Sequence, residues 1–255
     1  MSLDDCAGVL REHDPDRFGI CLLAPAAARP RLVTLYALNL ELARAPLATA
    51  EPLLAEMRLQ WWVEQLDDIA AGKPQLHELL APLAAAWGAR AGAFTALAEA
   101  RRRDTAREPH DGPEAVATYV RATAVPLALF AAEALDGPKA AMPAVAAQAE
   151  GVGLASWLAA LPVLQGLGLG LWDPAPAALA EIAALARRQL VAARSLRREV
   201  PRSLAPALFA GAAIRPVLAA APQGLEALAS ATPSEFRRRL ALGAFALTHR
   251  WCVAA

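Results

Sequence analysis

The histidines are the first residues to consider as metal ligands or catalytic bases, and their spacing favours neither role. They are His13, His77, His110 and His249. No two of them form an HxxxH or HExxH pair, and the sequence contains no GxSxG or GxxxxGK[ST] motif. The three cysteines are far apart and lack a CxxC spacing, so we expect reduced, structural thiols. Zinc, nucleophile-elbow and phosphate-loop chemistries are therefore not predicted.

Arg58 is the strongest candidate for binding an anion, because it precedes Trp61 and Trp62 by about one helical turn. The alternative is an ion-paired arginine that stacks on an aromatic ring. Neighbouring helical residues point about 100° apart, so we expect one tryptophan in the core and the other in a cleft or on a partner surface.

Three further charged groups resemble binding sites but are interpreted as solvated. Glu64, Asp67 and Asp68 lie at the expected end of a helix just before Gly72. Residues 101–104 (RRRD) are expected to be an exposed, self-paired run. The arginines between 187 and 198 are expected on a solvated face, with contact to anionic lipid head groups as the alternative.

The composition predicts an all-α fold. Hydrophobic residues make up 56% of the 255 positions, with Ala and Leu dominant, and both are strong helix formers. Proline and glycine divide the chain into expected helices at 3–13, 15–23, 27–45, 49–71, 75–87, 91–107, 113–136, 139–171, 175–199, 203–220 and 233–252. No long linker separates them, so we expect a single domain over residues 1–255, a bundle of about ten helices.

Residues 151–172 contain no charged side chain and are long enough to span a bilayer. Five glycines and Pro162 favour a buried core helix instead, with membrane contact or a membrane span as alternatives. The balance of 25 basic and 25 acidic residues excludes the overall basic character typical of nucleic-acid binding. The acidic first residues predict neither a secretory signal nor a transit peptide.

Several segments in order resemble the squalene and phytoene synthase family. They are LVTLYALNLELARAP at 32–46, the run through MRLQWW that follows, and FTALAEARRRDTAREPHDGPEAVATYVRATA at 94–124. The resemblance covers about residues 14–160. It implies an all-α isoprenoid-synthase fold and an activity that joins two prenyl diphosphates head to head. In that family, two Asp-rich motifs hold Mg²⁺, which prefers hard oxygen ligands.

The sequence departs from the family at both metal motifs. Counting from Tyr36-Ala37, the family's two aspartates fall on Ala43 and Leu47, and its arginine falls on Leu40. Glu41 is the only carboxylate between Tyr36 and residue 50. Residues 151–172, where the second motif is expected, contain no Asp or Glu. The runs NLELA and MRLQWW look like a branch of the family typified by a mitochondrial assembly factor for respiratory complex I.

These features predict a non-catalytic family member with no catalytic residue, metal or cofactor. It is expected in the cytoplasm or peripheral to the inner membrane, with subunits of a membrane respiratory complex as partners and no nucleic acid. The pocket candidates are Tyr36, Asn39, Arg58, Gln60, Trp61, Trp62 and Tyr119. Asn39 either lines this pocket or bridges two helices by a hydrogen bond.

Two other functions stay open. One is an active prenyl transferase in isoprenoid biosynthesis, in which Asp67, Asp68 and Asp104 would hold Mg²⁺. The other is a protein that binds an isoprenoid or another lipid in an apolar cavity without chemistry.

Overall fold

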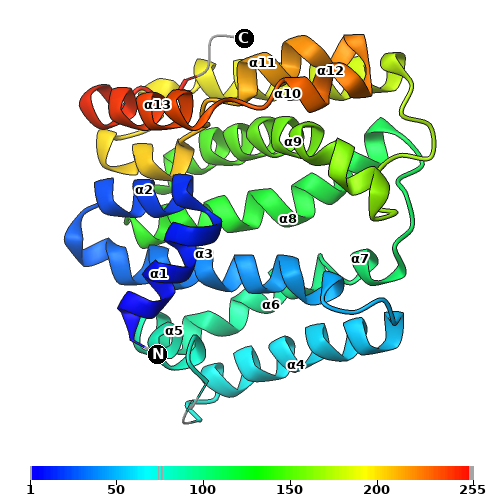
Figure 1. Ribbon diagram of the computed structural model, residues 1–255. Coiled ribbons are helices and arrows are strands. Elements are labelled where there is room, and N and C mark those ends of the chain that lie inside the picture. The colour runs from blue at the N-terminus through cyan, green and yellow to red at the C-terminus, as the bar shows by residue number, and fades with distance from the viewer. Residues whose placement is uncertain (1, 74, 76, 253–255) are drawn as a thin grey trace. The chain divides into compact units, whose positions relative to one another are not determined.

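The computed structural model describes residues 2–73, 75 and 77–252, and these residues form helices joined by short turns (Figure 1). The predicted all-α fold class is confirmed, because the described residues contain no named strand and only one isolated bridge, between His110 and Leu171. The chain divides into two compact units, Met1–Ala106 and Arg107–Ala255. Each is described by itself, and the single domain stays a prediction.

The first unit contains seven α-helices among its described residues: α1 (Leu3–His13), α2 (Pro15–Leu23), α3 (Arg29–Arg44), α4 (Pro52–Ala70), α5 (Leu80–Trp87), α6 (Thr95–Glu99) and α7 (Arg103–Ala106). Short 3-10 segments join them: η1 (Ala26–Ala28), η2 (Ala45–Leu47) and η3 (Gly88–Phe94). The expected bounds of α1 and α2 are confirmed. The Asp14 side chain caps α2 by accepting a hydrogen bond from the Arg17 amide, and Pro15 occupies the first turn.

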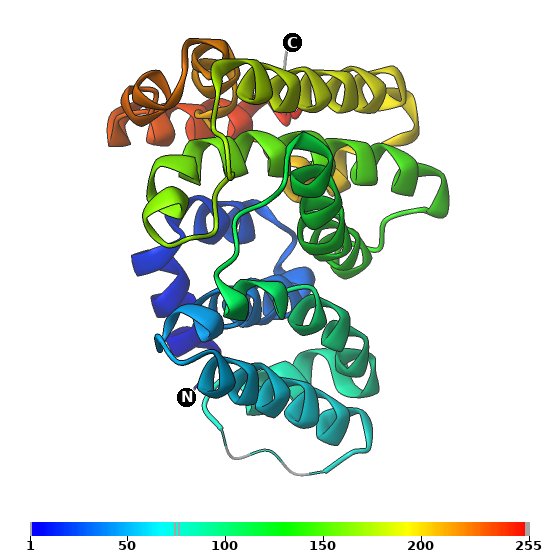
Figure 2. The ribbon, with the colours of Figure 1, turned by 90° about the vertical axis from the view of Figure 1, so that its right-hand side faces the viewer.

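The second unit contains α8 (Pro113–Ala134), α9 (Met142–Gly166), α10 (Pro176–Ser195), α11 (Ile214–Ala220), α12 (Leu225–Ser230) and α13 (Glu235–Thr248). Its 3-10 segments are η4 (Lys139–Ala141), η5 (Arg197–Glu199), η6 (Arg202–Leu208) and η7 (Ala221–Gln223). Figures 1 and 2 both show α9 beside α10, and α9 also packs on α8.

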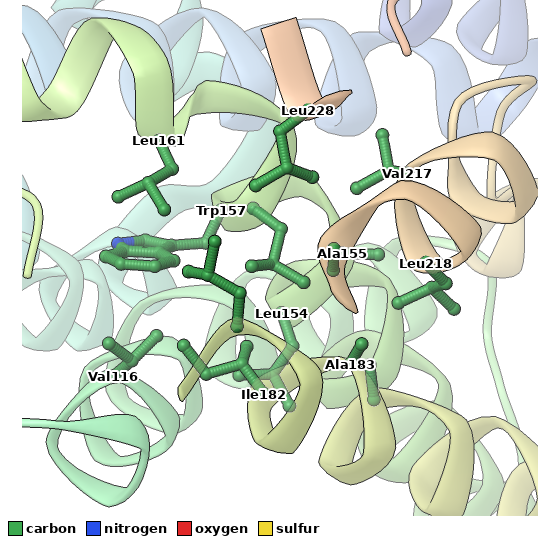
Figure 3. Packing of buried hydrophobic residues seen from close by; sticks show 14 of the residues in the cluster. Val116, Leu154, Ala155, Trp157, Leu161, Ile182, Ala183, Val217, Leu218 and Leu228 are labelled. Atoms are coloured by element: carbon green, nitrogen blue, oxygen red, sulfur yellow. The ribbon is translucent and has the colours of Figure 1, made fainter. Parts of the chain in front are cut away.

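The uncharged run belongs to the core of the second unit. Leu154, Trp157, Leu158 and Leu161 of α9 are buried in one cluster with residues of α8, α10, α11 and α12 (Figure 3). By length and composition alone, Pro113–Ala134 and Lys139–Gly166 could cross a membrane, a property shared by core helices of soluble proteins. The burial of this face supports the core-helix interpretation.

Two glycines of α9 allow its neighbours to approach closely. A Cβ on Gly151 would lie 2.8 Å from Leu190 Cγ and 2.9 Å from the Ala186 carbonyl oxygen of α10. A Cβ on Gly153 would lie 2.6 Å from the Val120 side chain of α8. Positions two apart on a helix point about 200° apart, so α8 and α10 cover opposite sides of α9.

Several expected helices differ from the observed ones: the helix expected at 75–87 begins at Leu80, that at 139–171 ends at Gly166, and that at 175–199 ends at Ser195. Residues 91–107 form part of η3 followed by α6 and α7, because Gly88 and Gly92 favour a tighter, broken path over one continuous helix. The helix expected at 203–220 is interrupted near Gly211, whose φ is +73°. Helix α12 was not expected, and α13 begins at Glu235, where the Ser234 hydroxyl caps the Arg237 amide.

Replacing Gly151 by alanine is expected to destabilise the protein by about 1–3 kcal/mol, because the new methyl group overlaps the α10 backbone. The matched control is Gly243→Ala in α13, where a Cβ meets nothing within 4 Å. That change is expected to stabilise by about 0.5–1 kcal/mol through helix propensity. Urea unfolding followed by circular dichroism compares the two, and equal effects would contradict close packing at Gly151.

Candidate functional site

A groove in the first unit brings together several of the predicted pocket residues. It encloses a volume of about 310 Å³. Its lining comes from the end of α3 and η2, from α4 and from the segment before α5: Glu41, Arg44, Ala45, Ala48, Arg58, Trp61, Trp62 and His77. The sequence had placed Arg58 and the two tryptophans in one pocket, and the structure adds the other five residues.

Three aromatic rings form one wall of the groove. The Trp61 and Trp62 ring centroids are 4.9 Å apart in an edge-to-face arrangement, and the His77 ring lies 5.3 Å and 5.5 Å from them. Trp62 is 6% exposed and Trp61 is 38% exposed, in agreement with their offset on the helix. The Leu79 amide donates to His77 Nδ1 at 3.2 Å, so the neutral imidazole carries its proton on Nε2.

The groove has an excess of positive charge. The Arg44 guanidinium lies 3.7 Å from the Glu41 carboxylate, and both side chains are partly exposed. Within the described residues, Arg58 makes no hydrogen bond, ion pair or ring contact, so the alternative of a paired, stacked arginine finds no support there. An exposed, uncompensated guanidinium beside aromatic rings is suited to binding a phosphate or carboxylate.

Tyr36 and Asn39 lie on α3 but do not line this groove. Both side chains are buried. The Arg17 guanidinium, paired with Asp14 at 3.0 Å, lies 5.3 Å from the Tyr36 ring centroid. Burial raises the pKa of Tyr36 above its usual range. Asn39 forms no side-chain hydrogen bond with any described residue, so the helix-bridging alternative finds no support.

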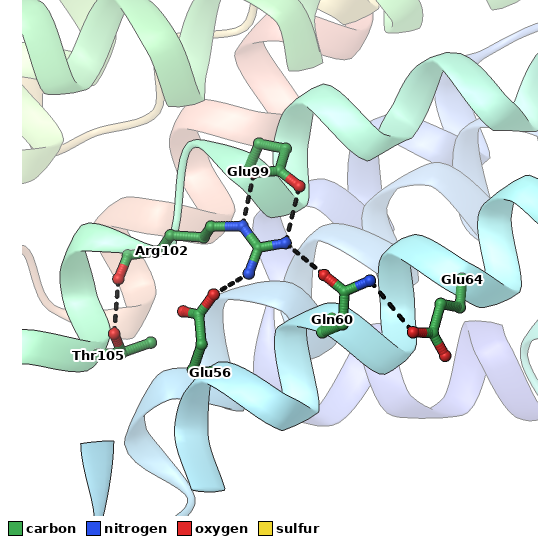
Figure 4. A network of polar contacts seen from close by, with 6 residues as sticks. All are labelled: Glu56, Gln60, Glu64, Glu99, Arg102 and Thr105. Atoms are coloured by element: carbon green, nitrogen blue, oxygen red, sulfur yellow. Dashed lines mark hydrogen bonds and ion pairs between the residues drawn. The ribbon is translucent and has the colours of Figure 1, made fainter. Parts of the chain in front are cut away.

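Gln60 belongs to a polar network on another face of α4, shown in Figure 4. The Arg102 guanidinium donates to the Gln60 amide oxygen at 2.7 Å and to Glu99 at 2.9 Å, and it also pairs with Glu56. The Gln60 amide donates to Glu64 at 3.1 Å. This network joins α4 to the segment between α6 and α7, which stabilises the helix that carries Arg58 and the tryptophans.

The expectation that residues 101–104 form an exposed run is wrong. Asp104 is buried, and its carboxylate lies 3.6 Å from the Arg101 guanidinium. Arg102 reaches across to α4 and is only partly exposed. The burial follows from these contacts between elements, which the local charge pattern does not reveal.

Tyr119 lies in the second unit, in an aromatic cluster of its own. The His110 ring is buried, 5.2 Å from the Tyr119 ring and 5.6 Å from Trp157 of α9. The His110 amide donates to the Gly170 carbonyl at 2.7 Å, and the Trp172 amide donates to the His110 carbonyl at 3.1 Å. The cluster therefore joins the segment before α8 to the segment after α9.

The donor set for Mg²⁺ does not fit. The side chains of Ala43 and Leu47 contain no oxygen that could bind a metal ion, and the nearby Glu41 carboxylate faces Arg44. Asp68 pairs with Lys73 at 2.6 Å, and Asp67 is exposed at the end of α4. Among the described residues, no three His, Cys, Asp or Glu side chains are grouped so that they could hold a metal ion. Asp67, Asp68 and Asp104 are therefore not assembled as a relocated site.

Comparison with known proteins identifies similar sequences. The model of a family described as squalene/phytoene synthase matches residues 10–161. Two curated relatives are NADH dehydrogenase (ubiquinone) complex I, assembly factor 6, from Bos taurus and Homo sapiens, 35% and 33% identical over 69 residues. Those residues are 27% of this chain and 21% of each relative, so the chain matches about a fifth of their length.

Two solved structures share the fold. Squalene synthase HpnC from Alicyclobacillus acidocaldarius superimposes with a TM-score of 0.69 at 17% identity, over 89% of this chain and 92% of that one. A dehydrosqualene synthase in complex with a ligand gives a TM-score of 0.65 at 13% identity, over 95% and 94%. At these identities the likeness concerns the fold alone.

The buried acids of the first unit predict a loss of stability at alkaline pH. Burial raises the pKa of Cys21 to about 12 and also raises that of Tyr36. Above about pH 9 the unfolded chain therefore releases protons that the folded chain retains, so the free energy of unfolding falls as pH rises. Each group contributes a slope of up to about 1.4 kcal/mol per pH unit.

Urea unfolding at about pH 8 and about pH 10 measures this loss, and a Cys21→Ala, Tyr36→Phe double variant is expected to show a smaller one. The same alkaline loss in parent and double variant would show that these groups do not cause it.

Proposed function

This chain belongs to the squalene/phytoene synthase family, and we propose that it is a non-catalytic member that acts in the assembly of a membrane respiratory complex. The observation that carries the proposal is the replacement of the metal-binding carboxylates in a chain that retains the fold. Ala43 and Leu47 occupy the positions of the first aspartate pair, and residues 151–172 contain no acid at all.

The loss matters because of the chemistry of the leaving group. A diphosphate departs readily only when cations neutralise the charge that develops on it, and Mg²⁺ contributes several kcal/mol to that step. Each 1.4 kcal/mol corresponds to about a tenfold change in rate. In this chain Glu41 faces Arg44 at 3.7 Å, and among the described residues it belongs to no group of three His, Cys, Asp or Glu side chains that could hold a metal ion. The energetic requirement for head-to-head prenyl transfer is therefore unmet.

The assembly role is supported by the curated relatives. The 69 residues that match complex I assembly factor 6 are about a quarter of this chain. A helical fold that no longer binds metal still offers groove and helix surfaces for recognising protein subunits. The proposed location is the cytoplasm or the periphery of the inner membrane, where the protein could meet such subunits.

The purified protein is expected to release no pyrophosphate from farnesyl or geranylgeranyl diphosphate with Mg²⁺ present, while an active squalene synthase in the same assay does. Deletion of the gene is expected to lower NADH:quinone activity in membranes, and re-expression of the intact chain to restore it. Mg²⁺-dependent turnover would refute the non-catalytic proposal. Unchanged NADH:quinone activity after deletion would refute the assembly role alone.

A second candidate function is binding of an isoprenoid diphosphate without turnover. The observation that favours it is the groove itself, where unpaired Arg58 and half-exposed Trp61 lie side by side on α4. A guanidinium binds a phosphate through charge-assisted hydrogen bonds, and an indole offers apolar surface to a prenyl chain. This function needs no metal ligand.

Titration with farnesyl diphosphate is expected to change the tryptophan fluorescence, and Arg58→Gln to weaken binding by about 10- to 100-fold through loss of one charge-assisted contact. Arg11→Gln, which removes an exposed arginine of α1, is the matched control. Separate titrations with pyrophosphate and with farnesol measure the two halves of the ligand. Equal affinities of the Arg58 and Arg11 variants would exclude this groove as the site.

A further inference from the structure

Positive charge is concentrated near the end of a chain that is neutral overall. Residues 187–250 contain eleven arginines, no lysine or aspartate and three glutamates, which is a net charge of +8. Nine of these arginines are exposed: Arg188, Arg194, Arg197, Arg198, Arg202, Arg215, Arg237, Arg239 and Arg250. The balance of the whole sequence conceals this local excess.

Most of the exposed guanidinium groups are uncompensated. Arg239 pairs with Glu235, and Arg202 contacts His249 Nδ1 at 3.2 Å. The other seven exposed guanidinium groups make no hydrogen bond or ion pair with any described residue. Like charges at this density repel one another, and an anionic partner would relieve that repulsion.

Helix α13 presents an apolar stripe to solvent. Phe236, Leu240 and Leu247 are 74%, 60% and 82% exposed. Their spacing of four and seven residues places them on one face, together with the exposed Gly243 and Ala244. The opposite face is anchored by Phe245, whose ring centroid lies 4.9 Å from that of Phe209. The exposed stripe therefore belongs to a helix whose other face is already packed.

The stripe and several of the exposed arginines lie in one region of the second unit. Cys252, which follows α13, lies near Arg194 and Arg197 at the end of α10 and in η5. Burial raises the pKa of its thiol, and the charges of these two arginines lower it. The carbonyl of Trp251 accepts a hydrogen bond from buried Gln148 of α9 at 3.3 Å. The contact between Arg202 and His249 joins η6 to the end of α13.

We propose that one surface of the second unit docks on an anionic phospholipid bilayer. This α13 surface consists of Phe236, Leu240 and Leu247 and the exposed arginines on or near that helix: Arg194, Arg197, Arg202, Arg237, Arg239 and Arg250. An amphipathic helix with a lengthwise apolar stripe and flanking cations lies in the interface, with its apolar side chains below the phosphates. A second copy of this chain would bring arginines against arginines. A nucleic acid would engage the arginines and leave the stripe in water.

Vesicle co-sedimentation of the full chain tests the proposal. Binding is expected to vesicles of phosphatidylcholine with about 30% phosphatidylglycerol, to be weak with phosphatidylcholine alone, and to fall as salt is raised. Arg194→Gln with Arg197→Gln is expected to lower the partition coefficient by about 25-fold, since each arginine near an anionic surface contributes a factor of about five. Leu240→Ser with Leu247→Ser is expected to lower it by about tenfold or more.

Matched controls distinguish an effect of this surface from the general effect of removing an exposed charge or an exposed apolar side chain. Arg11→Gln and Leu53→Ser alter exposed residues of the first unit and are expected to leave binding unchanged. Far-ultraviolet circular dichroism checks that every variant folds. Equal binding to neutral vesicles, or α13-surface variants that bind like the controls, would overturn the proposal. So would a dimer in light scattering that Leu240→Ser with Leu247→Ser abolishes, or tighter binding to a DNA duplex than to anionic vesicles.

Discussion

The burial of α9 on opposite sides is the constraint on which the second unit depends. Gly151 and Gly153 remove the side chains that would keep α10 and α8 away, and the leucines beyond them fill the space between helices. A helix enclosed in this way cannot hold an isolated carboxylate at low cost, because a buried, unpaired charge costs several kcal/mol. Glu150, at the edge of this region, is tolerated because the Arg121 guanidinium lies 3.3 Å away.

The same constraint explains how the missing metal motif and the fold fit together. Buried aspartates on such a helix are stable only while a cation compensates them. Once a chain no longer binds the metal, apolar residues at those positions pack better than carboxylates do. The uncharged run from Gly151 to Gly166 is therefore compatible with the well-packed core around α9.

Helix bounds could be predicted from sequence where a local signal marks the start or the end of the helix. Pro15 and the Asp14 cap define the start of α2, and both act within one turn. The end of α5 before Gly88 was predicted, but the 3-10 path around Gly92 and the break near Gly211 were not, since a glycine in an alanine-rich run is as compatible with a weak helical position as with a turn. Asp104 is buried on α7, which packs on α4 and η2, and such contacts between residues distant in sequence leave no local signal.

Part of the candidate site followed from helical geometry and part did not. Arg58 and Trp61 are three residues apart on α4. This separation is a rotation of about 300°, nearly a full turn, so the two side chains share a face. Gln60 is about 200° from Arg58 and turns away to the Arg102 network. His77 and Arg44 come from other elements, and no pattern within α4 predicts them. Tyr119 was grouped with the pocket residues only because of the family resemblance, and it lies in the second unit.

An arginine in the groove differs from a metal ion in what it does to a bound diphosphate. Arg58 would contact the phosphate with similar strength before and during bond cleavage, because its charge and position are fixed on α4. An interaction of equal strength in both states increases affinity and leaves the rate of the bound complex unchanged. Acceleration requires cations that bind the departing diphosphate more strongly than the intact ester, and the family's carboxylates hold those cations. A groove that offers a guanidinium but lacks such carboxylates would therefore bind a diphosphate without accelerating its departure.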